Sequence, residues 1–269
     1  MDRATAKIDS LIAKKERLIE LLEEKRGALI TRAVTRGLNP DAPLRDSDID
    51  WLGQVPKHWE VVRNKVVFRE RDERSSEGNE ELLTVSHITG VTPRSEKDVH
   101  MIMAESHEGY KLCHPGDLVI NTMWAWMGAL GVAFQEGMVS PSYNVYRYNP
   151  ARLLPRFLDY LCRTPSYVCG ITSYSKGIWT SRLRLYPESF LQLQTAIPPV
   201  DEQVQVVEFL DAESAKLKFV ISAITRAVEA LIEYRIALIT TAVTGKIDLR
   251  DPAQSVGSTN ARAASTLPA

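Results

Sequence analysis

A twelve-residue stretch, residues 174–185, gathers basic, aromatic and hydroxyl side chains around a glycine. It reads YSKGIWTSRLRL and contains the cations Lys176, Arg182 and Arg184, together with Trp179 and Ser181. Arginine can form bidentate hydrogen bonds to guanine, serine can bind phosphates or base edges, and tryptophan can pack on a sugar or an unstacked base. This combination predicts a contact with DNA.

A second candidate surface comes from residues 121–131, NTMWAWMGALG, and residues 140–147, SPSYNVYR. On an extended segment, Trp124 and Trp126 would face the same side because they are two positions apart. We group them with three further residues in one predicted DNA-binding set: Asn121, Tyr143 and Arg94. The alternative is that the tryptophans are core residues, which is the commoner outcome for an aromatic pair in an apolar run.

The charge of the chain is unevenly distributed. Residues 140–186 contain seven basic residues and one acidic residue, although the net charge of the chain is −1. A second basic cluster, at residues 63–74, is diluted by neighbouring carboxylates. This asymmetry is expected where one face meets phosphates. The alternative is that Arg152, Arg156 and Arg163, which fall on a predicted helix, are surface residues without a ligand.

The sequence has no recognisable catalytic centre. SPSY at residues 140–143 is close to a motif of amino-methyltransferases, but serine replaces the second proline and no glycine-rich loop precedes it. The five histidines have no metal-binding spacing, and the chain lacks GxSxG, HExxH and P-loop motifs. We therefore predict a protein that is not an enzyme and needs no metal or cofactor.

Composition predicts a soluble, cytoplasmic protein. The chain is 44% apolar and 25% charged, its three cysteines form no CxxC motif, and its N-terminus does not resemble a signal peptide. Residues 117–134 are the most apolar stretch, but polar residues and three glycines interrupt it. Two buried strands joined by a loop explain this stretch better than a membrane helix.

The elements around these surfaces include one sequence that occurs twice. Residues 28–34, ALITRAV, and residues 237–243, ALITTAV, belong to a similarity that extends over about 35 residues at a shift of 209 positions. Each copy predicts a helix near 50 Å long at 1.5 Å per residue. Seam positions recur at alternating intervals of three and four once Lys15 and Arg26 are counted with the apolar residues, as in a coiled coil. The predicted seam residues are Ile8, Ile12, Ile19, Leu22 and Leu29 in the first copy, and Leu217, Ile221, Ile224, Val228, Leu231 and Leu238 in the second.

The two copies would form an antiparallel coiled coil if the intervening chain returns to its starting end. The alternative is that each helix packs separately on the globular part. Arg26 and Arg235 occupy equivalent seam positions, where they could set the register or extend outward to solvent. Between the helices, short β-branched runs and the helical stretch RLLPRFLDYLCRT predict a mixed α/β (α+β) domain.

These patterns divide the chain into four predicted segments. A long helix covers residues 1–37, a domain with a leading linker covers residues 38–204, a second long helix covers residues 205–247, and residues 248–269 form a disordered tail rich in small and polar residues.

The order of several motifs resembles that of a known family. These motifs are the helix TAKIDSLIAKKERLIELLEEKRGALITRAVTRGL, then DSDIDWLGQVPKHWEV, GDLVINTMWAWMGALG and finally IPPVDEQVQVVEFLDAESAK. From residue 1 to about residue 251, the chain resembles the C-terminal half of a specificity (S) subunit of a type I restriction-modification enzyme. This chain departs from the family in the number of target-recognition domains. A full S subunit usually has two, whereas this chain has one.

The resemblance implies a function and partners. In the family, each target-recognition domain binds one half of a two-part site in double-stranded DNA, and the conserved helices form an antiparallel coiled coil that spaces two such domains. Modification (methyltransferase) subunits dock there and bring in the restriction subunits. With a single domain, the chain could be a natural half-subunit that forms a homodimer through its helices, or a fragment. The rival interpretation is a coiled-coil protein-interaction module that does not read DNA.

Overall fold

The structure is a computed structural model that describes residues 2–97, 106–179 and 182–244. Its helices are α1 (Asp2–Arg36), α2 (Pro155–Cys162), α3 (Pro165–Tyr174), α4 (Pro187–Gln192) and α5 (Val200–Val243). Its strands are β1 (Leu44–Asp46), β2 (Gln54–Pro56), β3 (Glu60–Arg63), β4 (Phe68–Arg71), β5 (Leu83–Ser86), β6 (Gly90–Pro93), β7 (Lys111–Cys113), β8 (Leu118–Asn121), β9 (Leu130–Val132), β10 (Gly137–Val139), β11 (Tyr143–Tyr148) and β12 (Gln194–Ile197). The predicted mixture of helix and strand is confirmed.

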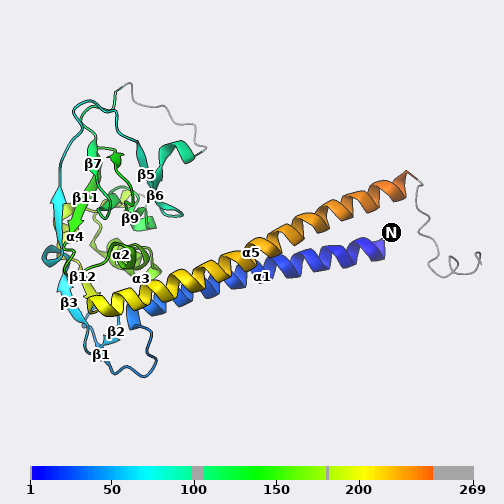
Figure 1. Cartoon of the computed structure of the whole chain (residues 1–269), viewed down its shortest axis with the longest axis horizontal. Helices are drawn as coiled ribbons and strands as arrows, with labels where there is room; N and C mark the ends of the chain where they lie inside the picture. The colour runs from blue at the N-terminus through cyan, green and yellow to red at the C-terminus, as the bar shows by residue number, and fades with distance from the viewer. Residues whose placement is uncertain (1, 98–105, 180–181, 245–269) are drawn as a thin grey trace, which may run out of the picture. The chain divides into compact units, whose positions relative to one another are not determined.

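The chain divides into two compact units (Figure 1). Residues 26–214 form one, which we call the globular unit. The described parts of residues 1–25 and 215–269 form the other, which we call the helical unit. The boundaries between the units fall inside α1 and α5, whereas the sequence suggested boundaries at the ends of these helices. The tail predicted for residues 248–269 lies outside the described residues.

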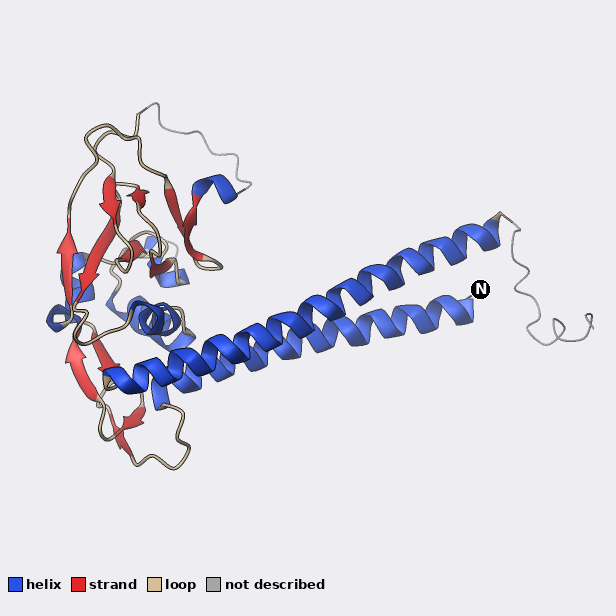
Figure 2. Cartoon of the chain, viewed as in Figure 1, coloured by secondary structure: helices blue, strands red, loops and turns tan. Residues whose placement is uncertain are grey.

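In the helical unit, α1 and α5 run antiparallel, as predicted (Figure 2). The predicted seam residues of this unit are half-buried, except Leu217 and Val228, which are buried. Leu29 lies in the globular unit and packs against its core. Arg235 does not remain unpaired in the seam, because its Nε lies 2.6 Å from Asp9 Oδ1 on the other helix.

An antiparallel sheet with the strand order β4-β11-β8-β9 forms the centre of the globular unit. The two-stranded pairs β1-β2, β3-β12, β5-β6 and β7-β10 complete the described strands. Strand β8 is buried along its whole length, and β9 pairs with it. Residues 117–134 therefore form two buried strands joined by a turn, as predicted from their sequence. No helix in the described part of the chain is long and apolar enough to cross a membrane.

The main core joins the sheet to helices from distant parts of the sequence. Phe157 and Leu161 of α2 pack in one cluster with Leu118 of β8. Val34, near the end of α1, and Val206, near the start of α5, belong to the same cluster. Each fully buried side chain of this size contributes about 1.5–3 kcal/mol. The adjoining ends of both long helices are therefore part of the globular core.

Helix α5 begins at Val200, five residues before the boundary predicted at residue 205. Pro199 ends the preceding loop, and Asp201 and Glu202 suit the positive N-terminus of a helix, so the helix can start directly after the prolines. The fully buried Gln203 fixes this start: its Nε2 donates to the carbonyl oxygens of Arg152 and Pro198, at 2.8 and 2.9 Å.

The C-terminus of α1 lies against the start of α5. Gly37 follows the helix with a φ of +73°, which favours glycine, and an added Cβ would lie 2.7 Å from Glu202 Oε1. The other carboxylate oxygen, Glu202 Oε2, accepts from the buried Trp59 Nε1 at 3.1 Å and lies 2.7 Å from His58 Nε2. The linker between α1 and the sheet is thereby held against α5.

Candidate nucleic-acid interface

Most arginines of the basic segment, residues 140–186, form ion pairs inside the globular unit. Arg147 donates from Nε and Nη2 to the two carboxylate oxygens of Asp117, at 2.9 and 3.1 Å, and Asp117 is only 2% exposed. These hydrogen bonds raise the pKa of Arg147 above its ordinary value. The other pairs are Arg152 with Glu60, Arg156 with Asp211 and Arg163 with Asp159. Much of the charge seen in the sequence is therefore neutralised within the fold.

Three cations of the segment are different. Lys176, Arg182 and Arg184 are exposed, and none of them pairs with an acidic side chain among the described residues. They lie on residues 176–179 and 182–184, which we call the basic loop. Lys176 and Arg184 exchange two backbone hydrogen bonds of 2.9 Å, so they form an antiparallel bridge at its base. Residues paired in this way project their side chains to the same side.

Two large apolar residues lie beyond these cations. Ile178 is 94% exposed and Trp179 is 69% exposed. The carbonyl oxygen of Trp179 accepts from the backbone nitrogen of Arg182 at 2.8 Å, which joins the two described sides of the loop. Gly177 permits this close approach, because an added Cβ would lie 2.7 Å from the carbonyl oxygen of Arg182. The loop therefore presents an apolar tip beside a cationic base.

The basic loop is anchored to the sheet. Leu185, which follows it, is buried and donates its backbone N–H to the carbonyl oxygen of Thr122 at 3.1 Å. The Thr122 hydroxyl in turn donates to the carbonyl oxygen of Ser142 at 2.9 Å. Through these contacts the loop is joined to the segments that follow β8 and precede β11, where the second predicted surface lies.

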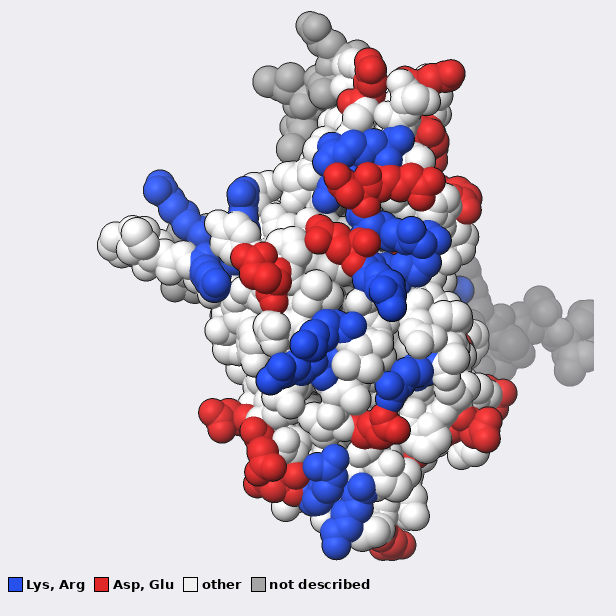
Figure 3. Space-filling view, turned by 90° about the vertical axis from the view of Figure 1, so that its left-hand side faces the viewer, with Lys and Arg blue, Asp and Glu red and all other residues white. Residues whose placement is uncertain are grey.

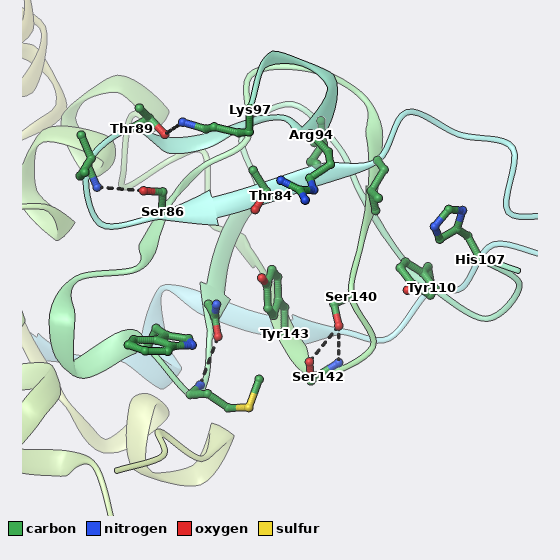
Figure 4. Close-up of a pocket in the computed structure, with 16 residues that line it drawn as sticks. Thr84, Ser86, Thr89, Arg94, Lys97, His107, Tyr110, Ser140, Ser142 and Tyr143 are labelled. Atoms are coloured by element: carbon green, nitrogen blue, oxygen red, sulfur yellow. Dashed lines mark hydrogen bonds between the residues drawn. The ribbon is translucent and has the colours of Figure 1, made fainter. Parts of the chain in front are cut away.

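That surface is a cavity of about 590 Å³ beside the β5-β6 hairpin (Figure 4). Four residues predicted from the sequence line it: Arg94, Asn121, Trp124 and Tyr143. Figure 4 shows Tyr143 directed toward Thr84. Burial raises the pKa of Tyr143, so the phenol stays protonated at neutral pH and can donate or accept a hydrogen bond.

The prediction that Trp124 and Trp126 share one face of an extended segment is wrong. Trp124 precedes the 3-10 turn η3 (Ala125–Met127) and Trp126 lies within it, and their rings are 6.3 Å apart at an interplanar angle of 20°. Only Trp124 lines the cavity and is largely exposed, at 52%; Trp126 is half-buried and donates Nε1 to the carbonyl oxygen of Met123. The turn is possible because Gly128 adopts a φ of +88° at its end. Apolar patterning alone could not distinguish this turn from a strand.

The structure thus sorts the predicted set into two adjoining groups. The cavity holds four members, the basic loop holds Lys176, Trp179, Arg182 and Arg184, and Ser181 lies outside the described residues. Further residues of the cavity were not predicted from the sequence, among them Thr84, Ser86 and Tyr110. Thr84 and Ser86 alternate with buried residues along β5, so the period of two in LTVS could have identified them.

Other exposed cations of the globular unit lie among acidic neighbours. Arg63, Lys65, Arg69 and Arg71 are exposed, but Glu70 sits between two of them on β4. On the face seen in Figure 3, clusters of lysine and arginine alternate with clusters of aspartate and glutamate. By contrast, residues 160–187 contain no acidic residue at all. The basic loop therefore suits a polyanion better than this face does.

The described residues contain no cluster of three or more His, Cys, Asp and Glu side chains that could hold a metal. Burial raises the pKa of the Cys113 thiol to about 12 and that of Cys162 well above its ordinary value. Both thiols therefore stay protonated at neutral pH and are poor nucleophiles. The geometry of this site consequently favours binding through cations, aromatic rings and hydroxyl groups.

Comparison of the structure with solved structures finds similar folds. One is a chain from work on complex assembly and conformational transition of the type I R-M system, with a TM-score of 0.56 and 19% identity over 89% of this chain. Others are the HsdS subunit from Thermoanaerobacter tengcongensis (TM-score 0.48, 18% identity, 91% of this chain) and the type I restriction-modification S subunit from M. genitalium (TM-score 0.45, 11% identity, 87% of this chain).

This chain spans 58%, 58% and 59% of the length of those three chains, in the same order. No protein-family model matches the sequence, and no curated protein matches it. At these identities, the likeness concerns the fold. Over nearly its whole length, this chain shares the fold of a chain from a type I restriction-modification system.

Proposed function

We propose that this protein is a non-catalytic DNA-specificity subunit of a type I restriction-modification enzyme, and that its globular unit reads one half of a two-part site. The observation that carries the proposal is the basic loop, where three cations without an acidic partner among the described residues adjoin a cavity lined by Trp124, Tyr143 and hydroxyl side chains. Exposed cations provide affinity for phosphates, and groups such as Asn121 and Arg94 can distinguish base edges. The shared fold supports the same function.

The finer part of the proposal concerns partners. The long helices would bind the modification (methyltransferase) subunits and, through them, the restriction subunits; alternatively they would pair with a second copy of the chain. Several apolar side chains outside the seam of the helical unit are exposed and available for such contacts, among them Leu11, Leu18 and Leu21 of α1 and Phe219 and Ile232 of α5. Exposed apolar surface of this kind often marks an interface.

The same side chains favour a second candidate function, a coiled-coil module whose globular unit binds protein. The two functions differ in how binding depends on salt. Each phosphate contact contributes about −0.9 to the slope of log K against log[salt], so a DNA reader shows a steep slope. A protein-binding module would show little affinity for DNA and no such slope.

The first experiment measures binding of the full chain to mixed-sequence duplexes between 50 and 300 mM salt by fluorescence anisotropy. The test variant is Arg182→Ala with Arg184→Ala. We expect it to lower the affinity by about tenfold or more and to reduce the salt slope by about two. If the affinity and the salt slope of this variant equal those of the wild type, the basic loop does not contact DNA.

The matched control is Arg69→Ala with Arg71→Ala, which removes the same charge from the exposed side of β4. We expect a smaller loss of affinity, because Glu70 and neighbouring carboxylates already weaken the potential there. If this control is the more damaging variant, DNA lies across the sheet face and not along the basic loop.

The second experiment addresses the partners. The chain would be co-expressed with a type I modification subunit, and methylated adenines would be mapped on the host DNA. A gapped motif with identical inverted halves would indicate two copies in a symmetric reader. An absence of methylation, with the partner active beside an intact S subunit, would contradict the assignment of a working half-subunit.

A further inference from the structure

The apolar tip of the basic loop consists of two adjacent exposed side chains, Ile178 and Trp179. Ile178 is the most exposed large apolar residue described in the chain, and it is followed directly by the exposed Trp179. Burying such side chains stabilises a folded protein, so leaving both in water forgoes that stabilisation. A surface of this kind usually marks an interaction site.

The charges around the tip identify the chemistry of its partner. Lys176, Arg182 and Arg184 surround it without a described acidic partner, so the loop attracts a polyanion. A nucleic acid is a polyanion that also offers apolar surface, because its stacked bases lie behind its phosphates. An apolar side chain can reach those bases by entering between them, as the inserted side chains of DNA-bending proteins do.

The geometry of the loop suits insertion. The antiparallel bridge between Lys176 and Arg184 makes the loop narrow at its base, and Leu185 holds that base to the sheet. A narrow, anchored hairpin can enter a groove while its flanking cations contact the phosphates on either side. Because Gly177 has no Cβ, its backbone can lie close to the carbonyl oxygen of Arg182, so the two sides of the loop come together there.

We infer that Ile178 and Trp179 form a wedge that inserts between two adjacent base pairs of bound duplex DNA, unstacks them and bends the helix axis. This inference rests on the proposed function, because it requires DNA to bind at the basic loop. It adds that the chain deforms its DNA, so the sequence at the unstacked step contributes to specificity through its deformability.

The test begins by selecting duplexes from a randomised pool with the full chain. The enriched duplex then carries 2-aminopurine at successive positions, because the fluorescence of this base rises when it is unstacked. We expect a rise of several-fold at one step with the wild type and no rise with Ile178→Ala plus Trp179→Ala. The variant should also bind about tenfold more weakly, from the loss of stacking.

Two further variants separate insertion from general damage. Trp179→Phe keeps a large aromatic ring and should retain most of the fluorescence rise. Val66→Ala with Phe134→Ala removes two other exposed apolar side chains of the globular unit, 47% and 50% exposed, and should behave as the wild type. Equal behaviour of this control and the tip variant would overturn the wedge.

The outcomes distinguish the two proposals. If no duplex is enriched and none binds, the proposed DNA function fails. If the duplex binds but 2-aminopurine fluorescence rises at no position, the DNA function stands and the wedge is wrong. The same holds if the tip variant raises this fluorescence as much as the wild type does. If the tip variant leaves DNA binding and fluorescence unchanged but no longer co-purifies with the modification subunit, the tip binds protein instead.

Discussion

Two stretches of the basic segment have similar composition but different surroundings. Between residues 147 and 163, four arginines lie on β11, α2 and the loops around them, and each pairs with a carboxylate. Between residues 176 and 184, three cations lie on a short loop and remain exposed without an acidic partner among the described residues. The first group holds the fold together, and the second is free to bind a ligand. A high density of positive charge in a sequence therefore does not by itself locate a binding surface.

Among the substitutions that test this comparison, Arg147→Ala should have the largest effect on the free energy of unfolding. The substitution leaves the buried carboxylate of Asp117 without its bidentate partner, and we expect a loss of about 3 kcal/mol in the free energy of unfolding, measured with urea. Arg147→Lys, which restores one charged donor, should recover part of the loss. A change below about 0.5 kcal/mol would mean that Asp117 is solvated well enough without the guanidinium.

A smaller effect is expected from Arg156→Ala. This guanidinium pairs with Asp211 at 2.9 Å and lies 5.3 Å from the ring centroid of Tyr160, but both charged partners are nearly half exposed. We expect a loss of about 1 kcal/mol in the free energy of unfolding and unchanged DNA binding. Weaker DNA binding with unchanged stability would break the comparison, because it would place Arg156 among the ligand-binding cations.

In the helical unit, Asp9→Ala should lower the free energy of unfolding by about 0.5 kcal/mol or less. The pair that it removes, Asp9 with Arg235, is 48% and 39% exposed, so solvent and salt screen it. Thermal unfolding at low and at high salt would measure the effect, which should vanish at high salt. A larger loss that persists in salt would show that Arg235 depends on Asp9 to remain in the seam.

The smallest effect on stability is expected from Arg182→Ala with Arg184→Ala. Neither side chain is buried or paired with a described carboxylate, so the free energy of unfolding should change by no more than about 0.5 kcal/mol. Urea unfolding would be compared with the loss of DNA affinity in the same variant. A destabilisation similar to that of Arg147→Ala would mean that the basic loop is structural, and the contrast between the two stretches would disappear.

The antiparallel helices and several strands could be predicted from local patterns. The repeat and its spacing of three and four indicate the two long helices, and the alternating run YNVYRY indicates β11. Helices α3 and α4 were missed: α3 contains Gly170 and small polar residues, and α4 has only six residues. Each begins with a proline, which is a start signal too weak to be decisive without tertiary contacts.

The sequence by itself determined which residues could be binding groups and which elements would be long helices, since residue chemistry and hydrophobic period are local properties. Only the tertiary structure decided which arginines are used up in ion pairs, because Asp117 and Asp211 are 30 and 55 positions away from their partners in the sequence. It also brought Arg94, Asn121 and Tyr143 to one cavity through the pairing of distant strands. Such neighbours depend on long-range packing, and no local pattern in the chain encodes them.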